Sequence, residues 1–268
     1  MINPRSPAYR ADIPGRDVTL ERSARVDQGK VLIVIPAFNE ERNIPTTVDQ
    51  IRSKAPGVDI LIVDDGSRDR TARAAEKAGA LVAKLPFNMG YGAAVQTGFK
   101  FALMKRYQYV VQMDADGQHD PASIQALLDE IRKGDVDVVI GSRFLADSPR
   151  YEAALSRRAG IYVFRKVVSI ITGQRSTDPT SGFQALNRDA LRFYASPYYP
   201  VDYPDADVII MLHKAGLRIR EIPVTMHARM VGESMHSGLK PVYYLFKMFL
   251  SIFVTLLRND RFVRRVDT

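Results

Sequence analysis

Residues 31–40 have the sequence VLIVIPAFNE, in which five large aliphatic side chains are followed at once by a proline and polar residues. A short apolar run that ends in turn-forming residues is typical of a buried β-strand. Similar runs occur at Ile60–Val63, Leu81–Lys84, Tyr109–Met113 and Val136–Ile140. Because helical stretches alternate with these runs, the sequence predicts an α/β fold with a mostly parallel sheet flanked by helices.

The polar segments after these five runs predict where a ligand should bind. In an open α/β sheet, the loops at the carboxyl ends of the strands gather at one edge, and ligands bind there. We therefore expect one site, built from residues 36–40, 64–67, 88–92, 114–118 and 141–143.

The composition limits the kinds of partner. The 268-residue chain carries 38 Lys and Arg against 30 Asp and Glu, and the net charge of +8 suits a phosphate-bearing partner. No nucleic-acid recognition motif accompanies this charge, so we expect no nucleic-acid partner. The chain has no cysteine, which excludes disulfides and thiolate metal sites, so any metal must have oxygen or imidazole ligands.

The chain is expected to have three regions. Residues 1–29 are rich in Arg, Pro and Asp and lack the apolar stretch of a secretory signal, so we expect a flexible arm and a cytoplasmic main body. Residues 30–240 are expected to form the globular α/β domain. Residues 241–268 are expected to form an apolar helix and a basic tail.

Two segments have helical apolar patterns that bear on membranes. In residues 157–172, apolar side chains at helical spacing lie beside arginines and a lysine, which predicts an amphipathic helix. Residues Val242–Leu257 are nearly all apolar. At about 1.5 Å per residue a helix of that length spans roughly 24 Å. This is shorter than the roughly 30 Å hydrocarbon layer, so we expect an interfacial or core helix.

The segment QMDADGQH, residues 112–119, places two carboxylates at the end of a predicted strand. Asp114 and Asp116 can turn toward one divalent cation, and Gln118 offers a further oxygen. Such hard ligands suit Mg²⁺ or Mn²⁺, with a nucleotide diphosphate supplying the rest. His119 is expected to be structural. The alternative is a solvated turn, because Asp and Gly are turn formers.

A second acidic strand end occurs at Asp64-Asp65. A carboxylate there can accept a hydrogen bond from the ring N–H of uracil or guanine. We expect Asp64 to be structural and Asp65 to face the ligand, although a helix cap is the alternative. Glu40 is either a helix-dipole residue or a further ligand contact.

Seven motifs in order resemble those of glycosyltransferase family 2, and most closely those of its dolichol-phosphate and polyprenyl-phosphate sugar synthases. The motifs are VIPAFNEERNI (34–44), VDDGSRDRT (63–71), NMGYGAA (88–94), QMDADGQHDP (112–121), GSRF (141–144), SGFQALNRDAL (181–191) and EIPVTMHARMVGES (221–234). The resemblance covers roughly residues 30–240 and identifies them as a catalytic domain. It implies a GT-A type fold, a nucleotide-sugar donor with Mg²⁺ or Mn²⁺, and inversion at the anomeric carbon.

The resemblance also assigns roles on the donor side. The base and ribose of a GDP- or UDP-sugar would be held by Pro36, Phe38, Glu40 and Asp65. The metal and diphosphate would be held by Asp114, Ala115, Asp116 and Gln118. The donor phosphates would also be reached by Arg143 and Arg229. Where such synthases usually carry a lysine six residues after the latter arginine, this chain has Met235.

The acceptor side rests on Ser156, Arg157 and Arg158, which resemble the serine–arginine motif that holds the lipid phosphate in such synthases. A guanidinium group matches phosphate geometry. The apolar side chains nearby would then lie on the cytoplasmic face of the membrane, as in a peripheral protein. The alternative is a solvated basic helix start.

The type of acceptor decides whether a base is needed. A phosphate monoester, with a second pKa of about 6, is already ionised near neutral pH, whereas a hydroxyl requires a general base. The resemblance places an acidic residue that faces the site at Asp207, which is our first candidate base, with Asp205 second. The alternatives are transfer to a hydroxyl of a cell-wall or exopolysaccharide precursor, and an inactive, membrane-recruited nucleotide-binding module.

Overall fold

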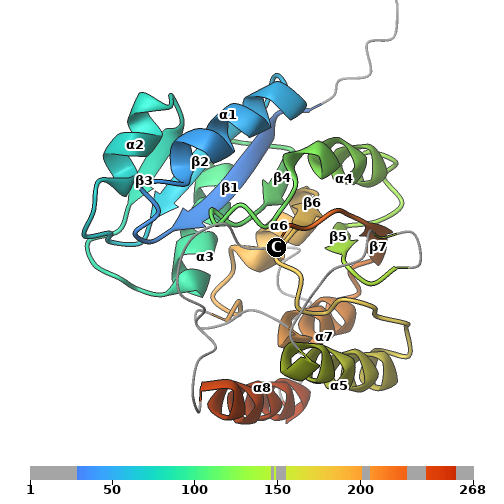
Figure 1. Ribbon diagram of the computed structural model, residues 1–268. Helices are drawn as coiled ribbons and strands as arrows, with labels where there is room; N and C mark the ends of the chain where they lie inside the picture. Colours follow the sequence, from blue (N-terminus) through green and yellow to red (C-terminus); the bar gives the residue numbers. More distant parts are fainter. Residues whose placement is uncertain (1–28, 146–147, 149–154, 201–205, 228–239, 258–268) are drawn as a thin grey trace, which may run out of the picture.

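The computed structural model describes residues 29–145, 148, 155–200, 206–227 and 240–257 (Figure 1). Within these residues a seven-stranded sheet has the order β3-β2-β1-β4-β6-β5-β7. The strands are β1 (Val31–Ala37), β2 (Asp59–Asp64), β3 (Leu81–Lys84), β4 (Tyr109–Gln112), β5 (Val138–Ser142), β6 (Gln184–Leu186) and β7 (Ile219–Pro223). All five predicted strands are present. The short β6 is antiparallel to both of its neighbours, and the other pairs are parallel, which confirms the mostly parallel sheet.

Helices cover both faces of the sheet because successive strand residues point to opposite sides. In β1, Ile33 and Ile35 belong to one buried cluster, and Leu32 and Val34 belong to the other. The first cluster contains side chains of α1 (Ile44–Lys54), α2 (Thr71–Lys77) and α4 (Ile124–Ile131). The second contains side chains of α3 (Tyr91–Met104), α6 (Arg188–Tyr194) and α7 (Ala206–Lys214).

Helix α3 packs closely on β1 at Gly98. A Cβ atom there would come within 2.3 Å of Val34 Cγ1, so a side chain at this position would push the helix off the sheet. Since α3 begins at Tyr91, this close packing also fixes the first turn of α3 at the carboxyl edge of the sheet.

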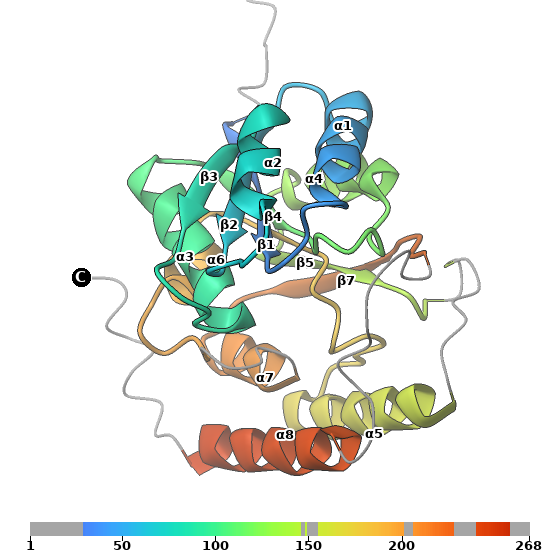
Figure 2. The same cartoon turned by 60° about the vertical axis from the view of Figure 1, so that its left-hand side comes forward.

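Two long helices lie furthest from the sheet, at the bottom of both ribbon views (Figures 1 and 2). Helix α5 (Leu155–Thr172) covers the predicted amphipathic segment, and α8 (Lys240–Leu257) covers the predicted apolar run. Phe164 of α5 is buried and its ring lies 5.7 Å from that of Phe249 of α8. Among the described helices, none combines the length and the apolar character that a membrane span requires.

Candidate active site

The loops after β1 and β2 are joined by hydrogen bonds between their backbones and side chains. Asn39 donates its backbone N–H to Ser67 Oγ (2.9 Å), and its own side-chain oxygen accepts from the N–H of Arg68 (2.9 Å). The N–H of Glu40 donates to Thr71 Oγ1 (2.8 Å). The structure therefore brings Glu40 beside the loop that carries Asp65, as expected.

Asp65 ties a third loop to the same edge. Its side chain is buried, and its two carboxylate oxygens accept hydrogen bonds from the backbone N–H groups of Met89 (2.7 Å) and Gly90 (2.9 Å). Gly66 permits this approach, since it has a φ of +68° and a Cβ there would lie 2.4 Å from the carbonyl carbon of Phe87. Sequence reasoning missed this loop-holding role of Asp65, and its contact with a nucleotide base stays a prediction.

Three other residues predicted at this edge differ in their exposure and contacts. Asp64 accepts a hydrogen bond from the N–H of Ser67 (2.9 Å), which is the structural role expected for it. Phe38 is 40% exposed, so its ring is available to a ligand. Pro36 is buried within β1.

The carboxylates of the predicted metal site follow β4. Asp114 Oδ1 accepts a hydrogen bond from the hydroxyl of Tyr91 (2.8 Å), and Asp116 Oδ1 accepts from the N–H of Gln118 (3.0 Å). Ala115, between them, is buried. The segment after β7 reaches this loop, because the N–H of His227 donates to the carbonyl oxygen of Gln118 (2.8 Å).

His119 fixes the turn from inside, as expected of a structural residue. Its Nδ1 accepts a hydrogen bond from the N–H of Asp114 (2.9 Å), and its ring stacks on Phe183 with centroids 4.8 Å apart. Burial lowers the pKa of His119 and outweighs the opposite effect of Asp114 and Asp116. The ring is therefore neutral at pH 7 and carries its proton on Nε2.

Burial also raises the pKa of Tyr91 well above its usual value, and the charge of Asp114 adds to this shift. The hydroxyl of Tyr91 is therefore protonated at any physiological pH. It can donate to Asp114 without competition from ionisation.

The donor set fits a divalent cation that is shared with a ligand. The Asp114 side chain is 31% exposed, and carboxylate oxygens suit Mg²⁺ or Mn²⁺. Among the described residues, no three His, Asp or Glu side chains come together into a complete metal site. A cation held by Asp114 and Asp116 would therefore need further oxygens, such as those of a diphosphate.

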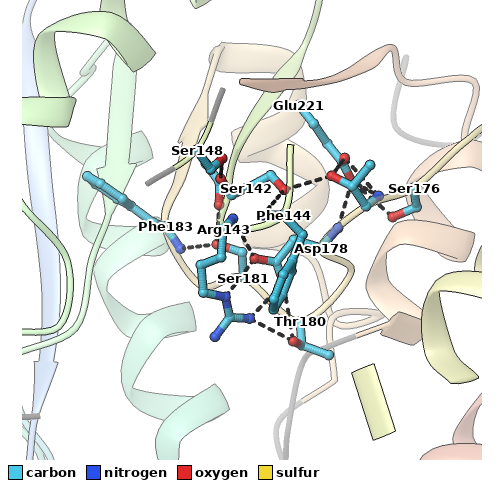
Figure 3. Close-up of polar contacts among 12 residues, drawn as sticks. Ser142, Arg143, Phe144, Ser148, Ser176, Asp178, Thr180, Ser181, Phe183 and Glu221 are labelled. Carbon is cyan, nitrogen blue, oxygen red and sulfur yellow. Dashed lines mark hydrogen bonds and ion pairs between the residues drawn. The ribbon is translucent and has the colours of Figure 1, made fainter. Parts of the chain in front are cut away.

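Arg143 follows β5 and is held in a buried network (Figure 3). Its Nε and one terminal nitrogen donate to the two oxygens of Asp178, at 2.7 and 2.6 Å, and the same terminal nitrogen donates to Thr180 Oγ1 at 3.0 Å. The backbone N–H of Arg143 donates to Asp178 as well (3.0 Å). Both members of the ion pair are buried.

Glu221 of β7 holds the loop that carries Asp178. Its carboxylate accepts hydrogen bonds from the hydroxyl of Ser176 (3.0 Å) and from the N–H and hydroxyl of Thr177 (Figure 3). Sequence reasoning missed the roles of Asp178 and Glu221. Two hints were available, because Asp178 lies just before the SGF motif and Glu221 is the first residue of another motif.

Asp207 lies at the start of α7 and is buried beneath α8. Its carboxylate accepts hydrogen bonds from the hydroxyl of Ser251 and from the N–H of Val208. The predicted acceptor residues 156–158 lie in the first turn of α5. Asp205, Arg229 and Met235 lie outside the described residues.

Comparison with known proteins gives the family. The family model described as glycosyl transferase family 2 matches residues 32–194. This chain belongs to glycosyltransferase family 2. The glycosyltransferase is 34% identical over 219 residues to undecaprenyl-phosphate mannosyltransferase of Micrococcus luteus, an alignment that covers 78% of this chain and 88% of that protein. It is 32% identical over 222 residues to polyprenol monophosphomannose synthase of Mycolicibacterium smegmatis, covering 78% and 82%.

Solved structures confirm the GT-A type fold of this glycosyltransferase. Glucosyl-3-phosphoglycerate synthase from Mycobacterium tuberculosis, in complex with uridine diphosphate, superposes with a TM-score of 0.63 at 20% identity. The alignment covers 87% of this chain and 82% of that one. Another structure of that synthase, with Mn²⁺ and UDP-glucose, has a TM-score of 0.62 at 20% identity and covers 84% and 79%.

Proposed function

We propose that this glycosyltransferase moves a hexose from a GDP- or UDP-sugar to a polyprenyl or dolichyl phosphate at a membrane surface, with inversion and with Mg²⁺ or Mn²⁺. The observation that carries this proposal is an outward-facing apolar surface on α8, which packs against α5, the helix that has Ser156, Arg157 and Arg158 in its first turn.

Helix α8 has apolar side chains on two faces. Met248, Ile252 and Thr255 are buried against the rest of the protein. Six other large apolar side chains of α8 are exposed, at spacings that place them on the opposite face: Phe249, Leu250, Phe253, Val254, Leu256 and Leu257. A soluble helix normally has polar residues on its outer face, so this surface suits an apolar environment.

Helix α5 also exposes the apolar side chains of Tyr162, Val163 and Ile170, and its buried Phe164 packs against Phe249 of α8. Large exposed apolar patches mark contacts with a membrane or another molecule. Insertion of such a surface to interfacial depth would bring the first turn of α5, with its two arginines, to the level of lipid headgroups.

The carboxyl edge of the sheet supports the donor half of the proposal. Asp114 and Asp116 would hold the cation, and the joined loops of Glu40 and Asp65 would hold the nucleoside. A bound divalent cation neutralises the charge that develops on a leaving diphosphate. The solved neighbour that holds Mn²⁺ and UDP-glucose on the same fold supports this arrangement.

The burial and hydrogen bonds of Asp207 support a phosphate acceptor over a hydroxyl acceptor. A general base must lie within hydrogen-bonding reach of the proton it removes. Asp207 is buried and bonded to Ser251, so it would have to leave α8 to act as such a base. An ionised phosphate needs no base. The names of two relatives, undecaprenyl-phosphate mannosyltransferase and polyprenol monophosphomannose synthase, also support a lipid-phosphate acceptor.

The proposal is tested by incubating the full chain with GDP- and UDP-sugars, Mg²⁺ or Mn²⁺, and undecaprenyl phosphate in vesicles. We expect release of nucleoside diphosphate that requires both the metal and the lipid phosphate. Release that requires a saccharide instead of the lipid phosphate would contradict the acceptor assignment.

A further inference from the structure

Tyr91 lies between two side chains of the neighbouring strand end. It is the first residue of α3 and belongs to the motif NMGYGAA, to which the proposed function gives no task. Its hydroxyl donates to Asp114 Oδ1 at 2.8 Å, and the side-chain amide of Gln112 donates to the same hydroxyl oxygen at 2.9 Å.

This chain of hydrogen bonds has a fixed direction. A carboxylate such as that of Asp114 can only accept, and a phenol has one proton to give. Because Gln112 donates to the oxygen of Tyr91, the single proton of Tyr91 is directed to Asp114. Gln112 is itself buried at the end of β4, so its amide has little freedom to turn.

The surroundings hold Tyr91 in place. Gly182 leaves just enough room for the group, since a Cβ there would lie 3.1 Å from the Tyr91 hydroxyl oxygen and 3.7 Å from Asp114 Oδ1. The neighbouring Phe183 stacks on His119, which accepts from the backbone of Asp114. Tyr91 thus holds the side chain of Asp114, and His119 holds its backbone N–H.

We propose that Tyr91 is a positioning residue for the metal-binding carboxylate of Asp114. By holding one oxygen of Asp114, the hydroxyl fixes the orientation in which the carboxylate meets the cation, so that the side chain does not have to be ordered when Mn²⁺ and the nucleotide bind. Partners that orient a metal ligand in this way typically change metal affinity by about 10- to 100-fold when they are removed. This inference rests on the proposed function, because it requires a cation at Asp114.

The test is Tyr91→Phe, which removes the hydroxyl and keeps the ring. Mn²⁺ binding to the full chain is measured by electron paramagnetic resonance, with UDP and then with GDP present. We expect the dissociation constant for Mn²⁺ to rise about tenfold. The change also leaves the buried amide of Gln112 without its acceptor, so Mn²⁺ binding is compared well below the melting temperature of the variant.

The matched control is Tyr107→Phe. Tyr107 also donates its hydroxyl to an aspartate, Asp59 at 2.6 Å, but Asp59 begins β2 and so lies at the opposite edge of the sheet. This variant should bind Mn²⁺ as the wild type does. A second variant, Gly182→Ala, should displace the Tyr91 hydroxyl without removing it and weaken Mn²⁺ binding in the same direction.

The outcomes are distinguishable. Wild-type affinity for Mn²⁺ in both Tyr91→Phe and Gly182→Ala would overturn the positioning role while leaving the proposed function intact. An equal loss in Tyr91→Phe and Tyr107→Phe would show a general structural effect and would also overturn it. If the wild-type protein fails to bind Mn²⁺ in the presence of UDP and also in the presence of GDP, the proposed function is overturned, and this inference with it.

Discussion

The carboxyl edge of the sheet and the surface of α5 and α8 differ in whether the protein itself satisfies their side chains. At the sheet edge, acidic side chains are held by donors from neighbouring loops: Asp65 by Met89 and Gly90, and Asp114 by Tyr91. On α8, large apolar side chains such as Phe253 and Leu257 are more than half exposed.

The difference follows from what each surface must do. Buried polar groups are costly unless they are hydrogen-bonded, and a site whose dipoles are already oriented loses little on reacting. The fold therefore completes most of the sheet edge on its own. Exposed apolar groups gain only when something covers them, so the helix surface depends on a partner, which we propose is the membrane.

The largest effect is expected from Asp116→Asn. Loss of one carboxylate charge weakens the binding of the cation that stabilises the leaving diphosphate, a stabilisation of several kcal/mol. A loss of about 4 kcal/mol corresponds to roughly a 1000-fold fall in kcat. Calorimetric titration with UDP or GDP should show that Mn²⁺ no longer strengthens nucleotide binding. Because Asp116 is partly exposed, the melting temperature should hold. Unchanged metal dependence would contradict the metal assignment.

The second prediction concerns the buried pair behind the site. Asp178→Asn removes the charge that faces Arg143, and breaking a buried ion pair typically costs about 3–5 kcal/mol. The control is Asp189→Asn, which breaks the exposed pair with Arg192 and should cost less than about 1 kcal/mol. Urea denaturation measures both. Equal losses of unfolding free energy would show that the network of Figure 3 does not hold this edge together.

The comparison also explains how much could be predicted from the sequence. Five strands were predicted because each is an apolar run that ends in turn formers. The strand β6 was missed because it has three residues, and β7 was missed because Arg220 and Glu221 interrupt its apolar pattern. The acidic strand ends were found because their position depends on local sequence and on the parallel topology.

What the sequence did not predict are partnerships between distant residues. Arg143 and Asp178 are 35 positions apart, and Asp207 and Ser251 are 44 positions apart. Asp207 was expected to face the site, but its surroundings depend on where α8 packs. The apolar pattern of α8 does not decide this, because both of its faces are apolar.

The third prediction addresses the acceptor. If the first turn of α5 binds an ionised phosphate, Arg157→Ala or Arg158→Ala should remove a charge-assisted hydrogen bond of about 1.5–3 kcal/mol, which raises the acceptor KM by about 10- to 100-fold. Slow hydrolysis of the donor by water should be nearly unchanged, since the sheet edge is intact.

Asp207→Asn should have a limited effect on transfer to a phosphate acceptor, because an ionised phosphate needs no general base. An inactive Asp207→Asn enzyme with normal donor binding, together with ordinary acceptor KM in the arginine variants, would favour the hydroxyl acceptor.

The smallest effect is expected from the outer face of α8. Phe253→Gln with Leu257→Gln changes side chains that are 58% and 69% exposed, so the unfolding free energy should shift by no more than about 0.5 kcal/mol per site. Binding to vesicles that contain anionic lipid should weaken about tenfold or more, because each apolar side chain that reaches hydrocarbon contributes about 1.5–3 kcal/mol at full burial. The control, Ile252→Ala on the buried face of the same helix, should cost about 2–5 kcal/mol of stability. Sedimentation with vesicles and thermal melting separate the two. If the double variant pellets with vesicles as the wild type does, the outer face of α8 does not bind the bilayer.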